Sequence, residues 1–131
     1  MASIGVTLKS ADWKTEKHVP AIDAPDAVKA GEAFEIAVCV GKEIAHPNTT
    51  LHFIEWISLY FIEDGKTAPV SLGRFEFSAH GASAEGADKG GVYTEPKATV
   101  KVKLAKSGTI KAVSYCNIHG LWEGEKAVSV A

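Results

Sequence analysis

Several short segments of this chain alternate large apolar residues with small or polar ones, and this period-two pattern constrains the fold most. Residues 34–40 read Phe-Glu-Ile-Ala-Val-Cys-Val, and residues 100–104 read Val-Lys-Val-Lys-Leu. Alternation of this kind is typical of β-strands that bury one face. Further strands are expected where β-branched and aromatic residues are frequent. These segments are 51–62, 70–77, 109–115 and 127–130.

Turn-forming dipeptides separate the expected strands. They are Ala30-Gly31, Gly41-Lys42, Asp64-Gly65, Ser107-Gly108 and Glu123-Gly124. About seven short strands with such turns, and no alternation of strands with helices, predict an all-β fold: an immunoglobulin-like antiparallel β-sandwich. We expect one domain over residues 1–131, with an irregular N-terminal segment 1–30 in which Pro20 and Pro25 oppose a helix. The stretch 78–95, rich in Gly and Ala, is expected to be a long surface loop.

The overall composition restricts the partners and the location of the chain. Of its 131 residues, 46% are hydrophobic and 23% are charged, and the formal net charge is −2. This charge provides no basic field that would attract nucleic acid or an anionic membrane. Residues 1–10 contain no apolar run typical of a signal peptide, and the apolar stretch 51–62 is too short and too polar to cross a bilayer. We therefore expect a cytoplasmic protein whose two cysteines, Cys39 and Cys116, are reduced.

Histidines and a cysteine lie near the expected strand ends, where they could bind a metal ion. Cys116 and His119 form a Cys-x-x-His sequence directly after the strand 109–115, and His46 and His52 lie six residues apart. The Cys-x-x-His pair alone is equally explained by a buried structural cysteine and a turn histidine. The pair of His46 and His52 alone is better explained by one ordinary surface histidine and one strand histidine. Together they predict a site at one end of the sandwich, because loops there often carry functional residues.

The kinds of ligand restrict the choice of metal. Imidazole nitrogens with one thiolate suit zinc, copper or iron and argue against magnesium or calcium. Structural zinc takes four tetrahedral ligands, which is fewer than the candidates present here. A blue copper site normally adds a weak axial methionine, and the only methionine is Met1. Copper with an axial backbone oxygen stays open on these grounds.

Three motifs resemble those of one known family. The motifs are Glu16-Lys17-His18-Val19-Pro20, His46-Pro47-Asn48-x3-His52 and Cys116-Asn117-x-His119-Gly120-x-Trp122. In this order and spacing, over residues 16–130, the chain resembles the superoxide reductases of the one-iron neelaredoxin type, which share the iron-binding domain of the desulfoferrodoxins. Two-iron relatives carry a further N-terminal domain whose iron is held by four cysteines, and this chain has only two cysteines.

The resemblance implies the metal and its ligands. It implies one mononuclear iron, Fe2+ or Fe3+, in a square-pyramidal site with Cys116 as the axial thiolate. The equatorial nitrogens would come from His18, His46, His52 and His119. Glu16 matches the glutamate that can fill the sixth position of ferric iron. Lys17 matches the lysine that lies near this position when it is open.

The resemblance also implies the activity and the partners. The protein would be an oxidoreductase that reduces superoxide by one electron to hydrogen peroxide, which is a detoxification reaction. An external electron donor, in relatives often rubredoxin, would re-reduce the iron, and the chain would form a homo-oligomer, a tetramer or a dimer. The positive charge of Lys17 would attract the superoxide anion locally, whereas the net charge of the chain provides no such attraction. Two alternatives stay open: a copper electron-transfer protein, and a metal-bound sensor without turnover.

Four residues beside the motifs carry further expectations. Backbone amides of Ile118 and His119 could donate hydrogen bonds to the Cys116 sulfur and tune the metal. Trp122 is expected either over the site or in ordinary core or interface packing. His80 lies outside every motif and is expected to be a surface histidine, and Cys39 is expected to be a small buried apolar residue.

Overall fold

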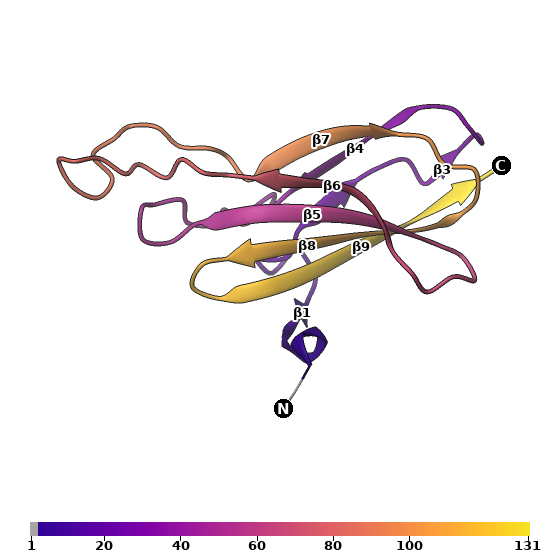
Figure 1. The fold of residues 1–131 in the computed structure, drawn as a ribbon, viewed down its shortest axis with the longest axis horizontal. Helices are drawn as coiled ribbons and strands as arrows, with labels where there is room; N and C mark the ends of the chain where they lie inside the picture. Colours follow the sequence, from indigo (N-terminus) through magenta and orange to yellow (C-terminus); the bar gives the residue numbers. More distant parts are fainter. Residues whose placement is uncertain (1–2) are drawn as a thin grey trace.

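Two β-sheets form the framework of the protein in the computed structural model, which describes residues 3–131 (Figure 1). A short 3-10 helix, η1 (Ile4–Thr7), precedes the first strand. The strands are β1 (Lys9–Ser10), β2 (Ala21–Asp23), β3 (Ala27–Val28), β4 (Phe34–Cys39), β5 (Ile54–Glu63), β6 (Val70–Glu76), β7 (Lys97–Val102), β8 (Gly108–Cys116) and β9 (Gly120–Val130).

The strands form one large and one small sheet. The large sheet has the order β1-β9-β8-β5-β6, with β3 also paired to β9, and the small sheet has the order β2-β4-β7. The pairs are antiparallel except for β1 with β9 and β3 with β9, which are short and parallel. The predicted all-β sandwich is thereby confirmed. Each segment expected to be a strand contains one, although β7 begins before residue 100 and β9 extends well before residue 127.

The inner faces of the two sheets share one hydrophobic core. Ile36 and Val38 of β4 are at most 1% exposed, and Ile57, Leu59 and Ile110 of β5 and β8 are 0% exposed. All five belong to one cluster, and for Ile36 and Val38 the alternation in the sequence predicts this burial. Burial of each such side chain is worth about 1.5–3 kcal/mol. The close-packed core therefore holds the strand ends, and the residues just beyond them, in defined positions.

One predicted turn is wrong: the dipeptide Glu123-Gly124 lies inside β9 and not between two strands. The reason is the packing of the segment before β2 against this strand. A Cβ atom at Gly124 would lie 2.3 Å from the backbone oxygen of Pro20. Glycine is therefore required here for a close approach of two backbones, and not for a change of chain direction.

Two further expectations can be compared with the structure. Cys39 is half-buried and not fully buried, and both cysteines are free. Among the described residues up to residue 30, the only elements are η1, β1, β2 and β3. The division of the chain into one domain with an irregular N-terminal segment stays a prediction. Met1, the only methionine of the sequence, lies outside the described residues. Within residues 3–131, no helix is long and apolar enough to cross a membrane.

Candidate metal centre

Three segments bring potential metal ligands to one end of the sandwich. Cys116 is the last residue of β8, and His119 lies in the short turn that leads into β9. His52 lies just before β5, whose first residue Ile54 pairs with Cys116. Figure 1 shows the end of β8 and the start of β5 at the same end of the large sheet. His18 reaches this point from the segment before β2.

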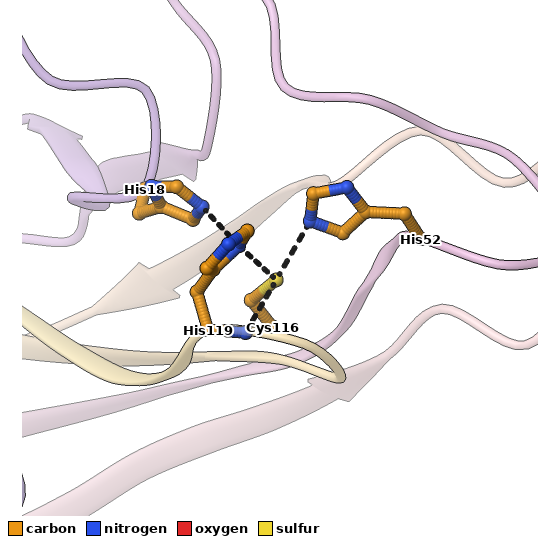
Figure 2. Close-up of side chains that lie close together, drawn as sticks. All are labelled: His18, His52, Cys116 and His119. Atoms are coloured by element: carbon orange, nitrogen blue, oxygen red, sulfur yellow. Dashed lines mark hydrogen bonds between the residues drawn. The ribbon is translucent and has the colours of Figure 1, made fainter.

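Four of the predicted ligands form a compact cluster. One nitrogen each of His18, His52 and His119 and the sulfur of Cys116 all lie within 4.8 Å of one another (Figure 2). His18 Nε2 lies 3.1 Å from His119 Nδ1, and His52 Nε2 lies 3.2 Å from the Cys116 sulfur. The distance from the sulfur to His119 Nδ1 is 3.8 Å. One metal ion can therefore contact all four atoms.

His46 lies beside this cluster and has an unused nitrogen. The centroid of its ring is 4.8 Å from those of His18 and His52. Its Nδ1 donates to the backbone oxygen of Pro47 at 2.6 Å, which leaves Nε2 without a proton. Among the described residues, His46 Nε2 is the buried side-chain nitrogen or oxygen that has no hydrogen-bond partner. A buried lone pair without a partner is costly, and a bound metal ion would satisfy it.

The turn that carries Cys116 and His119 is held by backbone geometry and by Asn117. Gly120 has a φ of +82°, which lets the chain return directly from β8 into β9. The Asn117 side chain accepts a hydrogen bond from the Phe53 amide at 2.9 Å and donates one to the Leu51 backbone oxygen at 2.9 Å. These bonds tie the turn to the segment that contains His52. Of the two amides expected to donate to the Cys116 sulfur, those of Ile118 and His119, the His119 amide does so at 3.4 Å.

Glu16 holds the His18 ring in one orientation. Its Oε1 accepts a hydrogen bond from the His18 backbone amide at 2.6 Å and lies 2.7 Å from His18 Nδ1. With Nδ1 protonated and facing this carboxylate, Nε2 presents its lone pair to the cluster. Burial raises the pKa of Glu16, but the hydrogen bonds from the His18 amide and ring, with the attraction of Lys17, outweigh it, and the net pKa lies below the usual range. The carboxylate is therefore ionised and lies on the outer side of His18.

The electrostatic environment favours neutral imidazoles. Burial, followed by repulsion from His18, His52 and Lys17, lowers the pKa of His46 to about 4 despite the opposing Pro47 bond. Burial is also the largest cause that lowers the pKa of His52, with added repulsion from His119, His18 and Lys17. For His18, burial outweighs the attraction of Glu16, and the pKa is lowered as well. Neutral imidazole is the form that binds a metal.

Trp122 and Lys17 lie close to the histidines. The Trp122 ring stacks on His18, with centroids 4.8 Å apart and planes at 13°. Its indole N–H donates to the His119 backbone oxygen at 3.2 Å, so Trp122 covers the site and supports two of its histidines. The half-buried Lys17 directly precedes His18 in the chain, and its repulsion contributes to the lowered pKa values of His18, His46 and His52.

The sequence matches a known family over most of its length. The model of the desulfoferrodoxin family matches residues 10–125. The chain belongs to the desulfoferrodoxin family. Within this family it is 52% identical over 122 residues to the neelaredoxin of Megalodesulfovibrio gigas, covering 93% of this chain and 94% of the relative. It is 51% identical over 122 residues to the superoxide reductase of Pyrococcus furiosus, covering 93% and 96%.

Solved structures of desulfoferrodoxin relatives have the same fold. The neelaredoxin of Archaeoglobus fulgidus, a superoxide reductase in the reduced form, superposes with a TM-score of 0.86 at 52% identity and covers 94% of this chain and 98% of that one. A crystal structure from Thermotoga maritima superposes with a TM-score of 0.96 at 52% identity, covering 100% and 99%. The resemblance inferred from the three motifs is thereby confirmed.

Two residues that support the site were not singled out by sequence reasoning. Asn117, which joins the two ligand-bearing segments, lies inside the Cys-x-x-His motif, so its position was available as a signal. Ser114 is fully buried on β8 and donates from its hydroxyl to the His18 backbone oxygen at 3.0 Å. A serine in an alternating strand carries no such signal, because its partner is 96 residues away in the chain.

Proposed function

We propose that this protein is a superoxide reductase with one mononuclear iron held by four histidines and one cysteine. The observation that carries this proposal is the convergence of imidazole nitrogens and one thiolate sulfur at the end of the sandwich. The orphaned, buried nitrogen of His46 beside them adds a fifth donor. Relatives that carry the name superoxide reductase share about half of the sequence over almost the whole chain.

Hydrogen bonds identify the nitrogen that each histidine would present to iron. His18 and His46 would bind through Nε2, because their Nδ1 atoms face Glu16 and Pro47. His52 would bind through Nε2, which faces the Cys116 sulfur, and His119 through Nδ1, which faces both His18 and that sulfur. When bound, iron supplies the single electron that the reduction of superoxide requires.

The protein supplies a site that is suited to an anionic substrate. Four neutral imidazoles and one thiolate neutralise less of the metal charge than a set of carboxylates would. Lys17 adds a positive charge near the same histidines. A unit charge about 6 Å from superoxide is worth roughly 3 kcal/mol at an effective dielectric constant of about 20. Lys17 therefore attracts the substrate locally in a chain whose net charge is −2.

The reaction consumes one electron and two protons for each superoxide and yields one hydrogen peroxide. Lys17 is proposed to hold the water that delivers these protons. Glu16 is proposed as the sixth ligand of ferric iron. To take this role, its carboxylate must leave both hydrogen bonds with His18. The same side chain would thus orient His18 in one state and approach the metal in the other.

The remaining partners follow from the proposed chemistry. Each turnover needs a new electron, so the protein requires an external donor, and a small iron–sulfur protein such as rubredoxin is proposed. A homo-oligomer, tetrameric or dimeric, and a cytoplasmic location are also proposed.

Stopped-flow mixing of the reduced, iron-loaded protein with superoxide tests the function. We expect superoxide to disappear at a rate proportional to protein concentration, with one hydrogen peroxide formed per iron oxidised. The zinc-loaded protein is the matched control, because zinc cannot supply an electron. EPR of the oxidised protein should show high-spin ferric iron, whereas a four-line hyperfine pattern would indicate copper. Decay of superoxide no faster than with the zinc-loaded control would contradict the proposal and favour a sensor without turnover.

A further inference from the structure

His80 is a buried histidine that the proposed chemistry does not use. The expectation of a surface histidine is wrong, because His80 is only 7% exposed. The segment 78–95, which extends beyond the end of the sheets in Figure 1, folds back on itself through a bridge between His80 and Tyr93. The imidazole stacks on the Phe53 ring, with centroids 3.7 Å apart and planes at 11°. This ring therefore lies in the junction between the loop and the start of β5.

Both nitrogens of the His80 ring face hydrogen-bond acceptors. Nε2 lies 2.5 Å from the Phe77 backbone oxygen. Nδ1 lies 2.9 Å from Asn48 Oδ1. The orientation of the Asn48 amide is determined by its other end, where Nδ2 donates to the Thr94 backbone oxygen at 3.1 Å. Turning this amide over would place two oxygens against each other, so Oδ1 must be the atom that faces His80.

The two acceptor oxygens require a ring that donates from both nitrogens. In either neutral tautomer, one lone pair would face an oxygen, and one buried hydrogen bond would be lost. Glu55 of β5 and Glu76 of β6 line the same cavity as His80, and Arg74 of β6 pairs with Glu76. On the loop side, Asp88 contacts Thr50.

The His80 ring is connected to the proposed ligands from two sides. Through Asn48 it contacts the segment between His46 and His52. Through Phe53 it supports the residue next to His52, and the peptide group of Phe53 exchanges hydrogen bonds with Asn117, the neighbour of Cys116. Thr50 strengthens the same junction, because its hydroxyl donates to the His80 backbone oxygen at 2.8 Å.

We propose that His80 is a positioning residue of the metal centre: its ring, donating from both nitrogens, clamps the loop 78–95 onto the segment 46–53. This segment carries two of the proposed ligands, so the clamp determines where their imidazoles lie. The inference rests on the metal site of the proposed function. It adds a residue that contacts neither substrate nor metal and acts through Asn48 and Phe53. Groups behind the ligands commonly change metal affinity by about 10–100-fold when removed.

The variant His80→Phe tests the clamp, because it keeps the stack on Phe53 and deletes both N–H donors. We expect iron to be lost to a chelator about ten-fold faster, and the thiolate-to-iron charge-transfer band of the oxidised protein to shift. The matched control is Val92→Ala in the same loop, where Val92 is 65% exposed. It should leave both readouts unchanged. A folded His80→Phe protein with a lower Tm but with the wild-type band and iron release would overturn the proposal.

Nitrogen-15 NMR of the metal-free wild-type chain tests the double donor without any variant. We expect both ring nitrogens of His80 to donate hydrogen bonds, as the two acceptor oxygens require. A single protonated ring nitrogen would overturn the clamp, even if His80→Phe did not fold. The NMR result does not depend on superoxide or iron. A chain that binds iron but does not reduce superoxide would therefore contradict the proposed function and leave the test of His80 intact.

Discussion

Acidification of the metal-free protein should remove stability through His46. The His46 side chain is buried, and burial with the repulsion from His18, His52 and Lys17 lowers its pKa from 6.5 to about 4. Between these two values the unfolded chain binds a proton at His46 and the folded chain does not. The stability is therefore fully present above pH 6.5 and is lost as the pH falls toward 4.

The size of the effect follows from the two pKa values. Each pKa unit corresponds to 1.36 kcal/mol, so the shift of His46 is worth about 3 kcal/mol in total. About 2 kcal/mol of this should be lost between pH 7 and about pH 4.5. The total stability of a domain is typically about 5–15 kcal/mol, so this loss is readily measurable. The lowered pKa values of His18 and His52 act in the same direction.

Urea unfolding of the metal-free protein, followed by tryptophan fluorescence across this pH range, measures the effect. The variant His46→Phe should unfold with a flatter pH dependence, lacking about 2 kcal/mol of the wild-type loss. If His46→Phe does not fold, His46→Gln serves the same purpose. The control Ile44→Ala lies in the same connection, is without an ionisable group and should keep the wild-type slope. Equal slopes for wild type and His46→Phe would refute the reasoning.

Three further predictions concern the metal centre. Lys17→Ala should slow the reaction with superoxide by about ten-fold at low ionic strength with iron still bound, and added salt should reduce the difference. The control variant Lys17→Arg should retain most of the rate. An unchanged stopped-flow rate of Lys17→Ala at low salt would contradict the role of Lys17. Cys116→Ser should abolish the thiolate-to-iron charge-transfer band, and survival of the band in the absorption spectrum would show that another group is the sulfur ligand. Trp122→Ala should lower the free energy of unfolding of the metal-free protein by about 1 kcal/mol, because the stack on His18 is lost. A thermal melt of this variant identical to that of the wild type would argue against the contact.

Much of the fold could be predicted because the alternating strands carry their own signal. In β4, the residues with the strongest apolar character are those that the core buries. The error at Gly124 shows the limit of such reasoning. Glycine serves turns and close backbone contacts equally well, and only the position of Pro20 distinguishes the two.

The candidate site could likewise be predicted only in part from the sequence. The motifs around His18, His52 and Cys116 were sufficient to predict the group that the structure brings together. The role of His80 could not be predicted, because its ring acquires its partners only when the loop 78–95 folds onto the segment around Asn48. An isolated histidine in a glycine-rich stretch has no local feature that distinguishes it from a surface residue.

The sequence by itself determined the strands, the family and the residue types that can bind a metal, because these depend on local pattern and on motif spacing. Only the tertiary structure decided which nitrogen of each ring faces the cluster. It also decided that Glu16 holds His18 from outside, and that His46 keeps a buried lone pair. Those properties depend on burial and on contacts between distant segments. Such contacts form only when the two sheets pack around their core, and no local sequence pattern predicts them.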